Sequence, residues 1–298
     1  MANYPTLVLP TGARFIALGA AGAVFQDGNG IVNKIPIVHD LTGCDEAVIT
    51  HIHHQEYISD VCITREKLIY QKLPKNPNIL DCLKITEDGL HFPYHPLGDL
   101  RTYLSNHQVP QSTRCGWIKN AIDAIAFIHS HNIIHADIGP RNFLVADDLS
   151  LKLCDFAGSV IVGDDMENYV EEEDRYRLAP GSSRSFATDL FALGCLIYEI
   201  SSGSPPYDEL DAEKVTVLYA IQSFPSSKGL RYHNLIQNCW NSTYTTASML
   251  QDDFLHYEHD ADRDPILRPW GRHLLVPVFW TLCLGSVIFL VHQKRILK

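Results

Sequence analysis

The sequence predicts an α+β fold, in which β-structure at the start of the chain is followed by a mostly helical remainder. Two observations support this prediction. The first ~70 residues alternate short apolar runs with turn-forming residues, and three later segments have the apolar rhythm of amphipathic helices. A length of 298 residues with 46% apolar residues supplies a core for one large domain or two small ones.

A β-hairpin is expected near the N-terminus. The turn Asp27-Gly28-Asn29-Gly30 lies between two short β-prone runs, residues 23–25 and 31–35. Asp-Gly and Asn-Gly pairs favour the tight turns that join antiparallel strands. Residues 15–18 form a further strand candidate in front of this hairpin. The chain is therefore expected to open with an antiparallel sheet.

The helical part begins with a segment that Pro74 ends. Apolar residues recur at helical spacing in three segments, 58–73, 112–130 and 188–201. The last of these has a broad apolar face, which indicates deep burial. Between the second and third helices, residues 142–145 and 149–154 are expected to form a pair of strands.

The composition excludes several classes of protein. A net charge of −11 argues against a protein that mainly grips phosphate backbones, so no nucleic-acid partner is expected. The eight cysteines stand singly, without the paired spacing of a zinc cage or a thioredoxin motif, and suit a reducing compartment. His51-Ile52-His53-His54 contains metal-capable side chains, but we interpret it as an ordinary loop.

Two short strings bring together the groups that phosphoryl transfer needs. The first is His135-Ala136-Asp137 with Asn142 five residues after the aspartate, and the second is Asp155-Phe156-Ala157-Gly158 beyond the expected strand pair. Two carboxylates and an amide oxygen can converge on one divalent metal and one hydroxyl. In phosphoryl transfer the protein mainly positions groups and neutralises charge.

These strings resemble the eukaryotic protein kinase family, whose catalytic loop reads H-R-D-x-x-x-x-N and whose metal loop reads D-F-G. The resemblance implies a bilobal fold with a small β-rich N-lobe and a larger helical C-lobe, and ATP and Mg²⁺ as cofactors. It implies that Asp137 is the catalytic base, that Asn142 and Asp155 hold Mg²⁺, and that His135 supports the loop.

The resemblance extends towards the N-terminus. Residues 18–25 are similar to the glycine-rich loop over the phosphates, with Gly19, Gly22 and Val24 in place. Glycine suits such a loop because a backbone without Cβ can approach phosphate oxygens. Lys34 resembles the lysine that holds the α- and β-phosphates, and Glu66 resembles the carboxylate that orients it.

The segment that follows the N-lobe is similar to the kinase hinge. By this resemblance, Phe92 is the gatekeeper, the carbonyl of Pro93 and the amide of His95 face adenine, and Asp99 approaches the ribose. Farther along, Asp189 opens a segment similar to the buried family helix and is expected to bond the catalytic-loop backbone. The compact pattern also resembles a divergent group of short fungal kinase-like proteins.

Four departures from the family pattern bear on activity. Ala136 replaces the arginine that pairs with an activation-loop phosphate, and Ala157 and Gly181 alter the D-F-G and A-P-E strings. Gly139 stands where Ser/Thr kinases carry a lysine, while Arg141 occupies the tyrosine-kinase arginine position and could neutralise the γ-phosphate. Hydroxyl preference stays open. We favour an active kinase over an ATP-binding pseudokinase scaffold or a small-molecule phosphotransferase.

The region between the metal loop and the A-P-E position is acidic. Residues 155–180 contain eight acids and two arginines. The ordinary interpretation is a solvated face. The sharper hypothesis is that Glu171-Glu172-Glu173-Asp174 is a built-in acidic element that selects basic substrates or replaces a phosphate.

We expect an N-lobe over residues 1–95, a C-lobe over 96–258 and a tail over 259–298. Within the tail, residues 274–291 carry no charge and would span roughly 27 Å as a helix, close to a bilayer core. We predict a membrane anchor there, which would leave a cytoplasmic kinase domain, with a buried terminal helix as the alternative. The stretch 14–25 has a weaker interpretation as a signal peptide. The expected partner is a protein substrate, and the oligomeric state is not readable.

Overall fold

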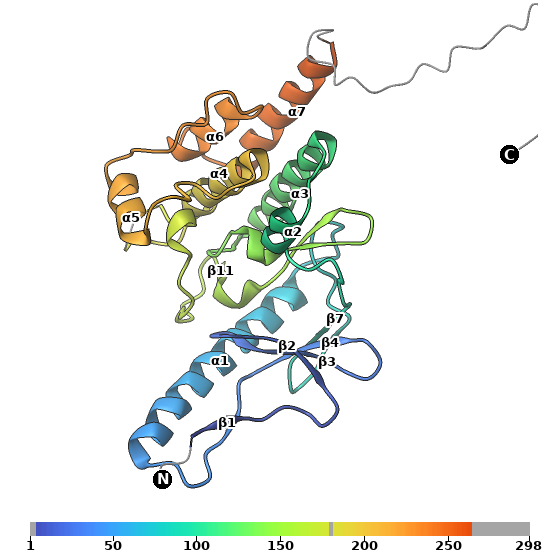
Figure 1. Cartoon of the computed structure of the whole chain (residues 1–298), viewed down its shortest axis with the longest axis vertical. Helices are drawn as coiled ribbons and strands as arrows, with labels where there is room; N and C mark the ends of the chain where they lie inside the picture. The colour runs from blue at the N-terminus through green and yellow to red at the C-terminus, as the bar shows by residue number, and fades with distance from the viewer. Residues whose placement is uncertain (1–3, 179–180, 264–298) are drawn as a thin grey trace, which may run out of the picture. The chain divides into compact units, whose positions relative to one another are not determined.

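The computed structural model describes residues 4–178 and 181–263 and has the predicted bilobal α+β architecture. Its N-lobe is an antiparallel five-stranded sheet in the order β2-β3-β4-β7-β6, with the long helix α1 beside it (Figure 1). The strands of the sheet are β2 (Arg14–Gly19), β3 (Gly22–Gln26), β4 (Val32–Ile35), β6 (Lys84–Ile85) and β7 (Leu90–Phe92). The stretch with the alternative interpretation as a signal peptide forms β2 and β3 of this sheet.

The predicted hairpin is the one between β3 and β4. The side chain of Asp27 accepts hydrogen bonds from the backbone N–H groups of Asn29 and Ile31, at 2.8 and 3.0 Å. Gly30 has a φ of +82°, which glycine adopts without a steric penalty. The hairpin sets the register in which Val24 faces Lys34 across the two strands.

Within the part of the chain that the structure describes, three short strand pairs lie outside the main sheet. The first joins β1 (Thr6–Leu7) to β5 (His39–Asp40), the second joins β8 (Ile133–Ile134) to β11 (Val160–Ile161), and the third joins β9 (Phe143–Val145) to β10 (Leu151–Leu153). The third pair confirms the strand pair expected between the second and third helices. It holds the two candidate catalytic strings at a fixed distance from each other.

Helix α1 (Glu46–Lys72) begins twelve residues before the periodic segment that predicted it. Asp45 caps its first turn by accepting from the N–H of Val48, and Pro74 follows its end. Most residues of its first half are exposed, so the apolar period there is weak. The interpretation of residues 51–54 as a loop was wrong, because they lie within this helix.

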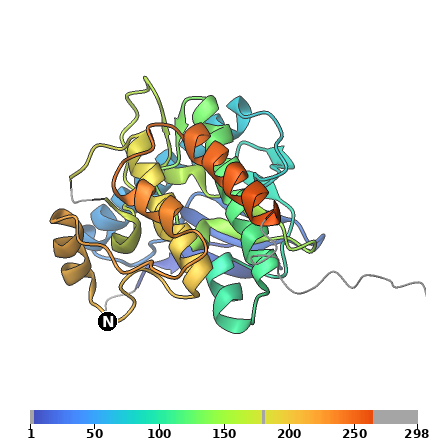
Figure 2. The same ribbon diagram turned by 90° about the horizontal axis from the view of Figure 1, so that it is seen from above.

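The C-lobe is built around α4, whose middle is buried on all sides. A capping box of Ser185 and Thr188 starts this helix. The helix packs against α3 and α6, which lie beside it in Figure 2. α3 and α4 confirm two predicted helices. The helices are α2 (Leu100–Asn106), α3 (Gln111–Ser130), α4 (Phe186–Ser202), α5 (Ala212–Ala220), α6 (His233–Trp240) and α7 (Ala247–Arg263), with 3-10 turns η1 (Pro140–Asn142), η2 (Phe156–Gly158) and η3 (Asp174–Tyr176).

The chain divides into two units, Met1–Glu258 and His259–Lys298. The predicted membrane-spanning segment, residues 274–291, lies outside the described residues. Among the residues that are described, no helix has the length and apolar character needed to cross a bilayer.

Candidate active site

A cavity of about 380 Å³ lies where the sheet meets the first residues of the C-lobe. Val24 and Val32 line it from the sheet, and Leu144 lines it from β9. Apolar walls of this kind, with a few charged groups among them, are typical of a small-molecule site. The predicted site residues that line it are Val24, Lys34, Glu66, Pro93, His95, Asp99, Arg141 and Asp155.

Lys34 forms the charged end of this cavity. Its ammonium lies 2.6 Å from Glu66 Oε2 and 2.7 Å from Asp155 Oδ1, so one cation joins β4, α1 and the metal-loop string. The Glu66 side chain is only 1% exposed, whereas that of Asp155 is 39% exposed. Asp155 is therefore the carboxylate that a ligand can reach.

The charges of this cluster stabilise one another. Burial opposes the charge on Lys34, but Asp155 and Glu66 raise the pKa of its ammonium above the usual range. Desolvation also opposes ionisation of Asp155, but Lys34 lowers the pKa of that carboxyl below its usual value. Burial raises the pKa of Glu66, against the effect of Lys34. At neutral pH the cavity therefore presents an ammonium and the exposed Asp155 carboxylate together.

Asp137 and Asn142 lie together in the catalytic loop. Asn142 Nδ2 donates to the Asp137 carboxylate at 2.8 Å and to the Asp137 carbonyl at 2.7 Å. Burial raises the pKa of Asp137, against the effects of His135 and Asn142. The nearby Asp155 adds to this increase, so the two aspartates are within electrostatic reach of each other.

Asp189 on α4 fixes the backbone of the catalytic loop. The Asp189 carboxylate accepts from the backbone N–H of His135 at 2.7 Å and of Ala136 at 2.9 Å, as the resemblance predicts. His129 Nε2 lies 2.8 Å from the same carboxylate. The ring of His135 is fully buried, with Nε2 3.1 Å from the carbonyl of Cys154. His135 therefore connects the catalytic loop to the strand that leads into Asp155.

The backbone at this site is strained in two places. Ala136 and Asp155 both have a φ of +60°, a left-handed conformation that costs energy for residues with a Cβ. The Asp189 hydrogen bonds fix the first of these residues. For the second, the ring of Phe156 packs against Tyr70 and His135 at centroid distances of 5.2 and 5.4 Å, and anchors the turn that follows Asp155.

The glycines of residues 18–25 do not line the cavity. Gly19 and Gly22 pair with each other at the ends of β2 and β3, on either side of the turn, while Ile16 and Ala17 of β2 line the cavity. A Cβ on Gly22 would meet the carbonyl oxygen of Ile35 at 2.8 Å. Gly22 is therefore needed for the close approach of β3 to the end of β4.

The hinge segment lines the cavity, but Asp99 has a structural task as well. Its carboxylate caps α2 by accepting from Thr102 N at 3.0 Å and from Thr102 Oγ1 at 2.7 Å. Arg141, at the rim of the cavity, is exposed. A separate cavity of about 620 Å³ shares Pro93 and His95 with the first and extends over residues 73–82.

The structure shows how the backbone accommodates Ala157 and Gly139, two of the departures from the kinase pattern. Ala157 has no positive φ, so alanine fits where the family string has glycine. A Cβ on Gly158 would meet Val170 Cβ at 2.8 Å, so this glycine allows the acidic segment to pack closely. Gly139 faces the ring of Tyr176, at 3.9 Å from a Cβ position.

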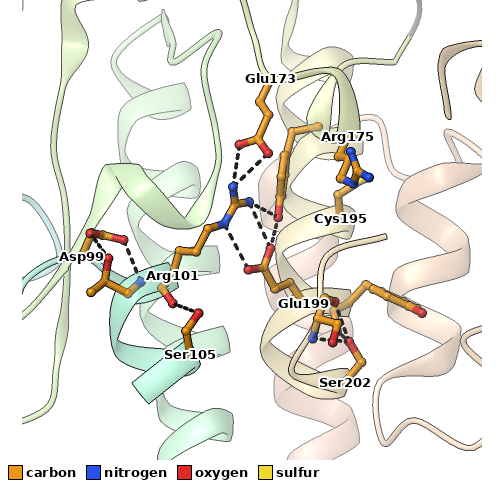
Figure 3. A network of polar contacts seen from close by, with 12 residues as sticks. Asp99, Arg101, Ser105, Glu173, Arg175, Cys195, Glu199 and Ser202 are labelled. Atoms are coloured by element: carbon orange, nitrogen blue, oxygen red, sulfur yellow. Dashed lines mark hydrogen bonds and ion pairs between the residues drawn. The ribbon is translucent and has the colours of Figure 1, made fainter. Parts of the chain in front are cut away.

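The acidic run is paired with arginines over part of its length. Both oxygens of Glu173 lie 2.9 Å from Nη1 of Arg101 on α2 (Figure 3), and Asp174 pairs with Arg177. Arg101 also reaches Glu199 on α4. The two side chains remain 41% and 36% exposed, so ion pairing does not remove Glu173 and Asp174 from the solvated face. Arg101 itself was missed by sequence reasoning, because no local pattern marks it.

The donor set fits a hard divalent cation. Asp155 offers a carboxylate oxygen, and Asn142 keeps its amide oxygen because its nitrogen is the atom that bonds Asp137. Mg²⁺ prefers such oxygen ligands and is commonly held by one or two of them together with substrate phosphates. Across residues 4–178 and 181–263, no group of three or more His, Cys, Asp and Glu side chains is placed to hold a metal.

The comparison with protein families decides the identity of the fold. The family model described as "Protein kinase domain" matches residues 28–261. The chain belongs to the protein kinase family. The match begins after β3, so it leaves out Gly19 and Gly22, and it includes Lys34, Glu66 and the two catalytic strings.

Several curated kinases are similar to parts of the chain. The Aurora/IPL1-related protein kinase 2 of Caenorhabditis elegans is 27% identical over 68% of this chain and 72% of its own length. The serine/threonine-protein kinase RUNKEL of Arabidopsis thaliana is 34% identical over 44% of this chain, which is a tenth of that protein. The serine/threonine-protein kinase PLK4 of Drosophila virilis is 26% identical over 54% of this chain and 22% of its own length.

Proposed function

We propose that this chain is an active protein kinase that transfers the γ-phosphoryl group of ATP to a hydroxyl of a protein. The observation that carries the proposal is the Lys34 cluster, in which one ammonium lies within 2.7 Å of two carboxylates at the end of an apolar cavity. The Asp137 and Asn142 pair lies next to this cluster, within electrostatic reach of Asp155.

Each group has a task in this proposal. Val24 and Leu144 form the apolar walls for the base, and the hinge around Pro93 and His95 runs along its edge. Lys34 attracts the phosphate oxygens, and Glu66 keeps the ammonium in place. Arg141, exposed at the rim, adds a second positive charge towards the γ-phosphate.

The transfer step is a displacement at phosphorus. The hydroxyl oxygen of the substrate forms a bond to the γ-phosphorus, while the bond from that phosphorus to the bridging oxygen breaks and ADP leaves. Asp137 takes the hydroxyl proton. Burial raises the pKa of its carboxyl, which makes the carboxylate a better proton acceptor than an exposed one. Asn142 fixes the orientation of Asp137 through two hydrogen bonds.

Asn142 and Asp155 would hold Mg²⁺ in this arrangement, with phosphate oxygens completing its ligands. The ion would neutralise phosphate charge. The pairing of Asp155 with Lys34 at 2.7 Å means that this carboxylate is already oriented towards the phosphate end of the cavity.

Two of the similar proteins are named serine/threonine-protein kinases, which supports Ser and Thr as the acceptors of this chain. The position of Arg141 follows the tyrosine-kinase pattern instead. We propose Ser/Thr transfer. A pool of peptides containing Ser, Thr or Tyr tests this with one measurement of the labelled residue. Labelled tyrosine alone would contradict it.

The test of the function itself is transfer of radiolabelled phosphate by the wild-type chain and by Asp137→Asn, which keeps the side-chain size and removes the base. We expect transfer to fall by about 10²–10⁴-fold in the variant. Equal transfer in both would end the proposal. If neither transfers phosphate but Mg·ATP raises the melting temperature of both, the chain is an ATP-binding scaffold instead.

A further inference from the structure

Arg101 lines a polar cavity of about 340 Å³ in the C-lobe. It comes from α2, whereas the carboxylates around it come from the acidic segment and from α4 (Figure 3). Its Nη1 donates to both oxygens of Glu173 at 2.9 Å, and its Nε and Nη2 approach the two oxygens of Glu199 at 3.4 Å. One guanidinium therefore engages both carboxylates.

Tyr176 completes the arrangement. Arg101 Nη2 lies 2.9 Å from the Tyr176 hydroxyl, which also bonds Glu199, and the guanidinium carbon lies 5.5 Å from the centre of the Tyr176 ring. The side chain of Glu199 is 3% exposed and that of Arg101 is 17% exposed. An arginine fork suits such a bidentate, partly buried site better than any other side chain.

The cavity lies next to the place where a substrate hydroxyl would be phosphorylated. The Tyr176 ring packs against Gly139, two residues after Asp137, and α2 packs against η1 of the same loop. Glu173 is close enough to contribute to the raised pKa of Asp137. A peptide bound with its hydroxyl at Asp137 would therefore pass near these carboxylates.

We infer that Arg101 is a specificity-determining residue that acts as an internal arginine, pairing with the carboxylates of the acidic cavity so that the kinase does not select basic substrates. This inference rests on the proposed function. It answers the question that the acidic run 171–174 raises, because two carboxylates that line the cavity, Glu173 and Glu199, are already bound to the chain's own guanidinium.

Two other charged residues, Arg175 and Asp208, line the cavity. Arg175 directs its Nη2 to the carbonyl oxygens of Tyr207 and Leu210 and so stays with the backbone. Asp208 lines the cavity on its other side. With Arg101 in place, the preferred substrate is a protein hydroxyl flanked by neutral or acidic residues. Without it, the cavity offers Glu173, Glu199 and Asp208 to a guanidinium.

The test compares two labelled peptides with a central serine, one with flanking arginines and one with citrulline in their place. Citrulline keeps the shape of arginine and removes its charge. Binding is measured by fluorescence anisotropy, so it does not depend on catalysis. We expect the wild-type chain to bind the two peptides with dissociation constants within about twofold of each other. We expect Arg101→Gln to bind the arginine peptide at least about tenfold more tightly than the citrulline peptide.

A second pair of variants keeps Arg101 and decides the question even if Arg101→Gln does not fold. Glu173→Gln and the matched control Glu171→Gln each remove one acid from the same run, and Glu171 is exposed. If Arg101 already pairs with the carboxylates of the cavity, both variants have the same ratio of affinities for the arginine and citrulline peptides as wild type. A wild-type preference for arginine that only Glu173→Gln removes would overturn the inference, as would an unchanged ratio in folded Arg101→Gln.

Phosphate transfer to the same two peptides separates this inference from the proposed function. If the wild-type chain transfers no phosphate to any acceptor, the proposed function fails. The ratios of affinity for the two peptides then still show whether Arg101 keeps the carboxylates of the acidic cavity from binding arginine.

Discussion

Two clusters in this kinase have the same design and different chemistry. In each, one cation joins two carboxylates, one of them buried and the other about two-fifths exposed: Lys34 with Glu66 and Asp155, and Arg101 with Glu199 and Glu173. The lysine is a compact charge at the end of a cavity, whereas the arginine is a planar fork with several bonds in place. In the first cluster, Lys34 is suited to give up a carboxylate contact and bind a ligand. In the second, Arg101 is suited to keep both of its carboxylates.

Lys34 is expected to show the largest effect. Lys34→Met removes the charge that would hold the phosphates, and we expect kcat/KM for phosphate transfer to fall by about 10²–10³-fold. The measurement is radiolabelled transfer to a mixed peptide pool. Lys214→Met, which removes an exposed lysine of α5, is the control and should transfer normally. A fall of less than threefold for Lys34→Met would remove the contrast between the clusters.

The second cluster should affect stability rather than transfer chemistry. Arg101→Ala leaves Glu199 buried without its cation, so we expect the free energy of unfolding to fall by about 3 kcal/mol. Urea denaturation followed by tryptophan fluorescence measures this loss. Adding Glu199→Gln should recover part of it, because the second change removes the uncompensated charge. If the double variant is as unstable as the sum of the singles, the two residues are not coupled.

The acidic segment also contains a carboxyl that gives a pH dependence. Burial, with help from Asp189, raises the pKa of Glu172 to about 7 from 4.5. Between these values the folded protein binds more protons than the unfolded chain, so stability falls as the pH rises through this window and is level above it.

Glu172→Gln should remove this slope. Since part of the group is exposed to solvent, we expect the variant to exceed wild type by only about 1 kcal/mol at pH 8, with no advantage at pH 4.5. Thermal unfolding of both proteins across that range gives the difference. Parallel curves for wild type and variant would show that Glu172 has no shifted titration.

Asp99 stands at the start of the helix that carries Arg101, and its change should have the smallest effect. Asp99→Ala removes the cap of α2 and should cost about 1 kcal/mol of unfolding free energy. Asp99→Asn keeps a capping oxygen and should be neutral. If Asp99→Asn instead weakens ATP binding in a thermal-shift titration, the carboxylate has the ribose role that the family resemblance implies.

Sequence reasoning predicted most of the fold because its signals are local. The turn at 27–30, the helix period of 112–130 and the strand pair around Asn142 each lie within a few neighbouring residues. It located the start of α1 too late, because the exposed first half of that helix has little apolar period and is instead defined by the Asp45 cap. A cap is a single residue, and many other aspartates in the chain begin no helix.

The sequence by itself determined the kinase family and the set of groups around Lys34 and Asp137, because these residues occur in short strings with fixed spacing. Only the tertiary structure decided which partner Glu173 of the acidic run has. Arg101, Glu173 and Glu199 are separated by up to 98 residues in the chain and meet through the packing of α2, η3 and α4. Ion pairs over such distances have no local pattern, since each partner alone looks like an ordinary surface charge.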